Sequence, residues 1–147
     1  MLKSQLLHPQ ILQALAKAGH GSKVLISDGN YPHWTKRGRN AELVYLNLTA
    51  GHPTVTEVLK VLVTAIPIEA AEVMDYARSG LYALEEDPPI WAEFRQVLGE
   101  AKINPELQKI ERFKFYDAAG TGDVCLTIAT GEQRIYANLL LTIGVVK

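Results

Sequence analysis

Two short segments near the N-terminus carry side chains suited to acid–base chemistry. His20 stands between two glycines, and Asp28 follows a short apolar run at 24–26 and precedes another glycine. Glycine lets the backbone turn tightly, so the imidazole can point where a regular helix or strand would not send it. An imidazole with an unperturbed pKa of about 6.5 can donate and accept protons near neutral pH. The two segments therefore predict an acid–base site.

The remaining candidates for chemistry are polar side chains scattered along the chain. They are His33, His52, Arg112, Tyr136 and Asn138. No pair of histidines has the close spacing of a metal motif such as His-Glu-x-x-His. No serine stands in a Gly-x-Ser-x-Gly elbow, and the glycine pair at 120–122 lacks the lysine of a phosphate loop. The residues by themselves thus favour a His/Asp acid–base site of undefined substrate over a metal-dependent or nucleophilic enzyme.

The composition is that of an ordinary globular protein, and it excludes several classes. Of 147 residues, 48% are hydrophobic and 21% are charged, with a net charge of -1. The only basic cluster is the short run 36–39, so we expect neither nucleic acid nor a membrane surface as a partner. The single cysteine, Cys125, leaves no internal disulfide and fits a reducing compartment. Because no signal-like or bilayer-spanning segment is present, we expect a cytoplasmic protein.

A helix and a strand must position His20 and Asp28. Pro9 suits the first turn of a helix, apolar residues at 11, 12, 15 and 16 follow at helical spacing, and Gly19 is suited to ending it. Residues 23–27 are short, apolar and partly β-branched, which predicts a buried strand. Asp28 then lies at the C-terminal end of this strand, where open α/β sheets usually build a site.

The rest of the chain alternates between predicted strands and helices. A capping box at Thr54 and Glu57 opens a second helix that Pro67 ends, and a third helix begins at 87–89. A helical turn is expected at 115–119. Further strands are predicted at 42–48, 68–74, 110–113, 123–130 and 139–146. This alternation predicts a layered α/β fold in a single domain over residues 1–147.

Several segments, taken in their order along the chain, resemble one known family. They are Gly19-His20-Gly21, Ser27-Asp28-Gly29, Leu48-Thr49-Ala50-Gly51, Ile66-Pro67-Ile68-Glu69-Ala70-Ala71, Arg112-Phe113-Lys114-Phe115-Tyr116 and Tyr136-Ala137-Asn138-Leu139-Leu140. Their succession resembles the D-ribose pyranase / L-fucose mutarotase family over nearly the whole chain. The resemblance implies a central mixed sheet flanked by helices. It also implies interconversion of the ring forms of a free monosaccharide without a cofactor or metal, by a homodecamer with sites near subunit boundaries.

The resemblance also assigns roles to individual residues. His20 matches the family's proton donor. The substrate-binding positions fall on Asp28, Arg112, Tyr136, Ala137 and Asn138. Arg112 is similar to the fucose branch, since the ribose branch has a histidine there, whereas the Tyr-Ala-Asn triplet is similar to the ribose branch. On the strength of Arg112 we expect L-fucose or a related sugar as substrate, with D-ribose pyranase as the alternative.

The expected chemistry is the opening and reclosure of a cyclic hemiacetal. One proton must leave the anomeric hydroxyl and another must reach the ring oxygen, and we expect His20 to protonate the ring oxygen and to recover the proton on closure. Asp28 would either accept hydrogen bonds from sugar hydroxyls or hold His20 in one tautomer. Tyr31 or Trp34 is suited to stacking on a sugar, or equally to a contact between subunits. A non-catalytic sugar-binding accessory protein of a transport operon is the alternative of another class.

Overall fold

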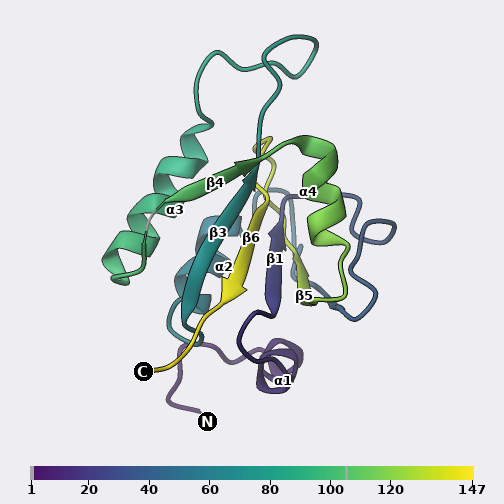
Figure 1. Cartoon of the computed structure of the whole chain (residues 1–147). Helices are drawn as coiled ribbons and strands as arrows, with labels where there is room; N and C mark the ends of the chain where they lie inside the picture. Colours follow the sequence, from purple (N-terminus) through teal and green to yellow (C-terminus); the bar gives the residue numbers. More distant parts are fainter. Residues whose placement is uncertain (1, 105) are drawn as a thin grey trace.

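One mixed sheet runs through the computed structural model, which describes residues 2–104 and 106–147 (Figure 1). Its strands are β1 (Lys23–Ser27), β2 (Glu42–Tyr45), β3 (Ile68–Met74), β4 (Leu107–Ile110), β5 (Val124–Ala129) and β6 (Leu139–Ile143). They lie in the order β2-β5-β1-β6-β3-β4. The β6 strand runs antiparallel to both of its neighbours, and the other pairings are parallel. The carboxyl ends of five strands and the start of β6 therefore meet at one edge.

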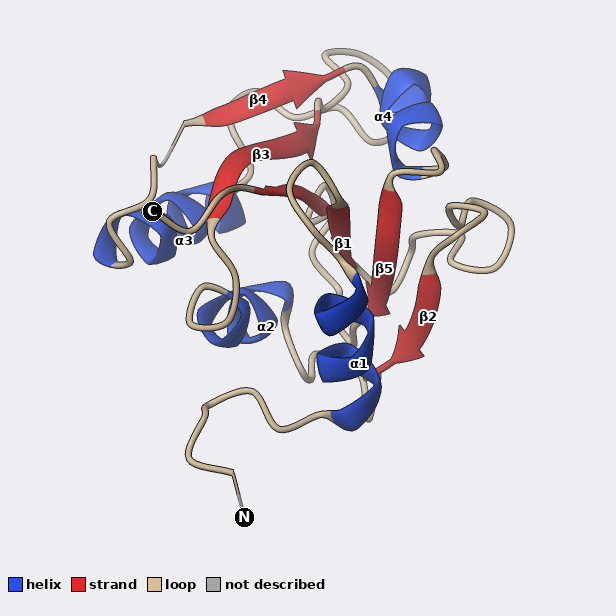
Figure 2. Ribbon diagram, turned by 60° about the horizontal axis from the view of Figure 1, so that its bottom comes forward, coloured by secondary structure: helices blue, strands red, loops and turns tan. Residues whose placement is uncertain are grey.

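Four helices cover the two faces of this sheet. They are α1 (Pro9–Lys17), α2 (Val55–Leu62), α3 (Pro89–Glu100) and α4 (Arg112–Ala119). The first three lie on one face, where α2 and α3 pack against each other, and α4 lies on the other face (Figures 1 and 2). The predicted layered α/β architecture with a central mixed sheet is thus confirmed. None of the helices in the described ranges is long and apolar enough to cross a bilayer.

The two central strands are apolar because both of their faces are covered. The apolar side chains of β1 at 24–26 and of β6 at 139–141 are fully buried. A strand buried on both faces reads as a continuous apolar run rather than as an alternation. On the face covered by α1, α2 and α3, the largest buried side chains are Trp91 and Phe94 of α3. On the opposite face, Phe115 of α4 is buried. This core fixes β1, and hence the position of Asp28 at its end.

Local capping interactions set the starts of the first two helices. The predicted capping box is present: the Glu57 amide donates to the Thr54 hydroxyl at 3.0 Å, and the Thr54 amide donates to the Glu57 carboxylate at 2.6 Å. At the start of α1 the His8 ring nitrogen Nδ1 accepts from the Ile11 amide at 3.4 Å. These bonds satisfy amides that a helix leaves unpaired in its first turn.

The structure corrects the prediction for residues 110–113. The strand is β4, which ends at Ile110, and Arg112 begins a helix instead of continuing the strand. The Glu111 carboxylate accepts from the amides of Phe113 and Lys114 at 2.9 and 3.1 Å, and so caps α4. Because this local cap competes successfully with the apolar pattern, Arg112 stands in the first turn of α4 at the carboxyl edge of the sheet.

The remaining differences concern where strands and helices end; α2, for example, ends at Leu62, before Pro67. Residues 68–74 form a strand as predicted, although their Glu-Ala-Ala-Glu sequence favours a helix, because β4 and β6 pair with them on both sides. The β2 strand ends at Tyr45 rather than at 48, and β6 ends at Ile143 rather than at 146.

Candidate active site

A pocket of about 280 Å³ lies at the carboxyl edge of the sheet. Each part of its wall comes from a segment that ends or begins there: Asp28 after β1, Met74 at the end of β3, Arg112 after β4 and Asn138 just before β6. Its lining residues are Asp28, Asn30, Tyr31, Met74, Tyr82, Arg112, Tyr116, Ile135, Tyr136 and Asn138. Four of the sequence-predicted binding residues thus come together from distant parts of the chain, and Ala137 lies buried between two of them.

Asp28 is held at the base of this pocket by a set of hydrogen bonds. Its Oδ1 accepts from the Asn30 amide at 2.9 Å, and its Oδ2 accepts from Asn138 Nδ2 at 3.0 Å and from the Ala137 amide at 3.4 Å. The Asp28 amide in turn donates to Asn138 Oδ1 at 3.0 Å. Asp28 and Asn138 therefore bind each other reciprocally, which joins the end of β1 to the start of β6.

Burial raises the pKa of Asp28 from 3.8 to about 6. The side chain lies almost entirely out of water, which disfavours the charged carboxylate. Bonds from the backbone amides of Asn30, Ala137 and Tyr31 oppose this effect, and the nearby Glu132 charge adds slightly to it. A carboxyl group with such a pKa changes its protonation state close to neutral pH, as groups that move protons in enzymes often do.

Tyr136 connects the pocket to the long segment between β3 and α3. Its hydroxyl donates to the Tyr82 carbonyl at 2.9 Å and accepts from the Ala77 amide at 3.1 Å. Its own carbonyl accepts from the Trp91 indole at 2.9 Å. The residue has φ 57°, a left-handed conformation that is uncommon for a tyrosine. These three bonds, two from the backbone and one from a core side chain, hold it in that conformation.

Arg112 brings the only guanidinium to the pocket wall. Its guanidinium carbon lies 5.9 Å from the centre of the Tyr116 ring, which also lines the pocket. Interaction with the Tyr116 side chain raises the pKa of Arg112 further above its usual value. Within the described ranges no carboxylate lies close enough to form a salt bridge with it, so the guanidinium charge is not neutralised by an acidic side chain there.

His20 lies outside this pocket. It precedes β1, whereas Asp28 follows it, and a five-residue strand spans about 16 Å. His20 Nε2 instead lies 3.0 Å from the Glu69 carboxylate, on a surface where its side chain is 60% exposed. Within one chain, Asp28 therefore does not hold His20 in one tautomer. Glu69 is the carboxylate that contacts the His20 ring, and in the sequence it stands out only as part of the segment 66–71.

The aromatic residues of the loop after β1 take different positions. Tyr31 is buried and lines the pocket, and its hydroxyl donates to the Lys36 carbonyl at 3.2 Å. Trp34 is 74% exposed and packs its ring against Arg37, outside the pocket lining. Of the two aromatic candidates, Tyr31 therefore lines the pocket of its own chain and Trp34 does not. Sequence reasoning missed Tyr82 and Met74, because nothing in their local sequence indicates that they reach this edge.

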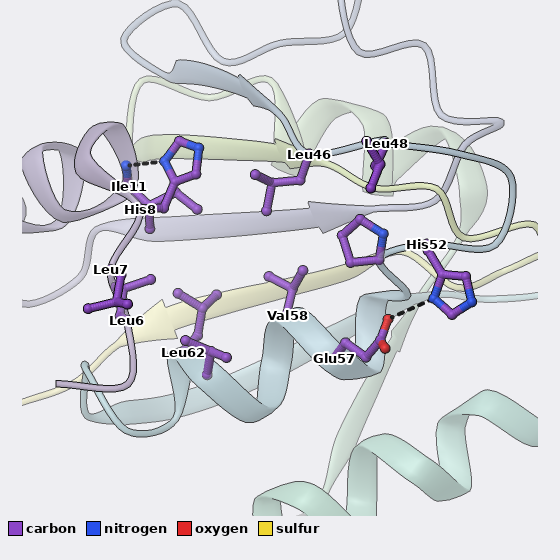
Figure 3. Close-up of a pocket in the computed structure, with 12 residues that line it drawn as sticks. Leu6, Leu7, His8, Ile11, Leu46, Leu48, His52, Glu57, Val58 and Leu62 are labelled. Atoms are coloured by element: carbon purple, nitrogen blue, oxygen red, sulfur yellow. Dashed lines mark hydrogen bonds and ion pairs between the residues drawn. The ribbon is translucent and has the colours of Figure 1, made fainter.

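A larger hollow, of about 490 Å³, is apolar and lies elsewhere (Figure 3). Leucines and valines from the N-terminal segment and from α2 surround it, among them Leu6, Val58 and Leu62. The two histidines at its border already have partners: His8 caps α1, and His52 Nδ1 lies 3.6 Å from the Glu57 carboxylate. Because a hydroxyl-rich ligand needs several convergent polar partners, this hollow does not suit one.

The described part of the chain contains no group of three or more histidine, cysteine, aspartate or glutamate side chains placed to hold a metal ion. Cys125 is half-buried on β5, and burial raises the pKa of its thiol. A thiol of this kind is poorly suited to act as a nucleophile. The chemistry available at the pocket is therefore that of one carboxyl group, one guanidinium, tyrosines and amides.

An α/β sheet with a polar, aromatic-lined pocket at its carboxyl edge is an arrangement suited to a small polar ligand. The chain belongs to the RbsD / FucU transport protein family, whose family model matches residues 1–146. It is 30% identical to a fucose mutarotase of Danio rerio over 95% of this chain and 90% of that protein. It is 32% identical to a D-ribose pyranase of Variovorax paradoxus over 99% and 98% of the two chains.

The fold is also that of a solved structure. The crystal structure of a fucose mutarotase from Streptococcus pneumoniae, in complex with L-fucose, matches with a TM-score of 0.83 and 22% identity, over 100% of both chains. The predicted family is confirmed, and the predicted class of enzyme, an isomerase acting on sugar ring forms, agrees with the names of these relatives.

Proposed function

We propose that this chain interconverts the ring forms of a free monosaccharide by opening and reclosing its hemiacetal. The observation that carries the proposal is the pocket at the carboxyl edge, where Asp28, Asn138 and Arg112 converge among tyrosines. Leaving a buried polar partner unpaired costs about 1–3 kcal/mol, so such a pocket favours a ligand with several hydroxyl groups. The names of the curated relatives support ring-form interconversion as the activity.

The proton donor in this proposal is His20 of a neighbouring copy. Within one chain the strand β1 separates His20 from the pocket, so a site that contains both needs two subunits. His20 and Glu69 lie on an exposed surface, where a neighbouring copy can dock. Glu69 engages Nε2 and leaves Nδ1 for the sugar. A homo-oligomer, of which the decamer is the form implied by the family resemblance, and a cytoplasmic location complete the proposal.

L-Fucose or a related sugar is the proposed substrate. Arg112 supplies a charged donor for sugar hydroxyls, and the apolar side chains of Met74 and Ile135 line the same pocket. D-Ribose is the alternative, since the Tyr136-Ala137-Asn138 triplet is similar to the ribose branch and a ribose pyranase is among the relatives. The non-catalytic accessory protein remains the candidate of another class, which the description of the family as transport proteins favours.

Exchange between sugar anomers, followed by saturation-transfer NMR, tests the proposal. The wild-type protein should accelerate exchange of L-fucose or D-ribose, and His20→Ala should abolish the acceleration. His52→Ala is the matched control, because His52 is also an exposed histidine paired with a glutamate but borders the apolar hollow. Equal rates for the His20 variant and the wild type would exclude His20 as the donor. Binding of a sugar without acceleration of any sugar would favour the accessory protein.

A further inference from the structure

The hydrogen bonds of the Asp28 side chain divide unequally between its two oxygens. Oδ2 accepts from the Asn138 side chain and from the Ala137 amide, whereas Oδ1 accepts from the Asn30 amide. These bonds fix the orientation of the carboxyl group at the base of the pocket. Oδ1, with the fewer of these partners, is the oxygen suited to engage a hydroxyl of a ligand.

Asp28 is also the sole carboxyl group among the residues that line the pocket. The other titratable groups that face it are on four different segments: Tyr31 and His33 after β1, Tyr82 before α3, Arg112 and Tyr116 on α4, and Glu132 and Tyr136 after β5. Burial raises the pKa of Tyr31, so its neutral form persists and cannot accept a proton. Arg112 is always protonated. His33 and Glu132 do not line the pocket. Among the lining residues, Asp28 is therefore the carboxyl group that can alternate between taking up and releasing a proton near neutral pH.

Ring opening requires such a group. When the bond between the anomeric carbon and the ring oxygen breaks, the ring oxygen gains a proton and the anomeric hydroxyl loses one. In the function proposed above, His20 supplies the proton to the ring oxygen. The pocket must then provide an acceptor for the proton of the anomeric hydroxyl, and a base beside a sugar typically contributes a factor of about 10²–10⁴ in rate.

We propose that Asp28 is the general base of this reaction rather than only a sugar-binding residue. Its Oδ1 takes the proton of the anomeric hydroxyl while the ring C–O bond breaks, and the electron pair of the O–H bond forms the aldehyde carbonyl. The ring oxygen takes a proton from the imidazolium of His20 on the neighbouring subunit. On reclosure Asp28 returns its proton to the new anomeric hydroxyl and His20 recovers the other, so that neither group is consumed. This inference rests on the proposed ring-form interconversion.

The experiment is a comparison of wild type and Asp28→Asn at several pH values, by saturation-transfer NMR with L-fucose and D-ribose. We expect kcat of the variant to fall roughly a hundredfold or more, with sugar affinity changed only a few-fold. Added formate should restore part of the rate, because a small carboxylate can replace the missing base. A higher KM with an unchanged kcat would overturn the inference, as would a variant rate that formate does not raise.

The wild type supplies a second measurement that does not depend on the folding of the variant. If Asp28 must be ionised, log kcat/KM should fall by one unit per pH unit below about pH 6. A rate that stays level down to pH 4.5, after subtraction of the uncatalysed exchange, would exclude Asp28 as the base. If the wild type accelerates no sugar at all, the proposed function itself fails, whereas an active wild type with an Asp28→Asn variant of unchanged kcat and raised KM refutes this inference alone.

Discussion

Two inactive variants should restore activity when they assemble together. The structure places His20 and Asp28 at opposite ends of β1, about 16 Å apart along the strand, and on different surfaces of the chain. If each site takes Asp28 from one subunit and His20 from another, neither His20→Ala nor Asp28→Asn leaves a complete site in its own assembly. In a mixed assembly, an intact His20 can meet an intact Asp28.

The activity expected of the mixed assembly follows from the fraction of its sites that contain both an intact Asp28 and an intact His20. With equal amounts of the two chains mixed at random, an intact pocket occurs with probability one half and so does an intact donor. Each site is built by one surface of each of two subunits, so about one quarter of the sites should be complete. Co-expression of the two variants with different affinity tags, followed by tandem purification, gives the mixed assembly. Exchange of L-fucose or D-ribose anomers then measures its activity against the wild type.

A pair of variants on the same surface provides the control. Glu69 lies beside His20 on the same surface of one subunit. In a mixture of His20→Ala with Glu69→Ala, half of the sites lack the His20 donor, and the other half contain His20 without Glu69. No site in this mixture therefore has both groups intact. This mixture should not exceed the mean of its two components. Activity of the His20→Ala and Asp28→Asn mixture at the level of the separate variants would refute a site shared between subunits.

Three further predictions concern the positioning of His20, stability and the pocket wall. Glu69→Gln should lower kcat roughly tenfold with little change in KM, because an exposed amide holds the His20 imidazole less firmly than a carboxylate does, and an unchanged kcat would contradict this role. The folded chain keeps a proton on Asp28 between pH 3.8 and about 6 that the unfolded chain releases, so the free energy of unfolding should fall with rising pH in this window by at most about 3 kcal/mol. Urea unfolding titrations at several pH values should show this fall in the wild type and not in Asp28→Asn. The same pH dependence of the free energy of unfolding in both proteins would refute it. Tyr136→Phe should raise KM several-fold, because the lost hydroxyl no longer holds the segment before α3. Thr54→Ala is the control and should cost about 1 kcal/mol of stability without changing kcat or KM. Equal KM values for the two variants would contradict the role of the Tyr136 hydroxyl.

Much of the fold follows from local pattern. The buried β1 strand, the capping box at Thr54 and the helix after the prolines at 88–89 all stand where their sequences predict them. The apolar residues of the segment 110–113 predict a strand, and this prediction is wrong beyond Ile110 because a side-chain cap at Glu111 starts a helix there. An apolar pattern shows which residues are buried, but a few hydrogen bonds at its border decide which element forms.

The sequence by itself determined the family and the residue types of the site. The order of its motifs is local information, and Asp28, Arg112 and Asn138 can be identified from it. Only the tertiary structure decided which of these residues share a site. Asp28 and Asn138 meet although 110 positions separate them, because β1 and β6 are antiparallel neighbours in the sheet. His20, only eight positions before Asp28, is kept away from it because an extended strand carries its two ends apart.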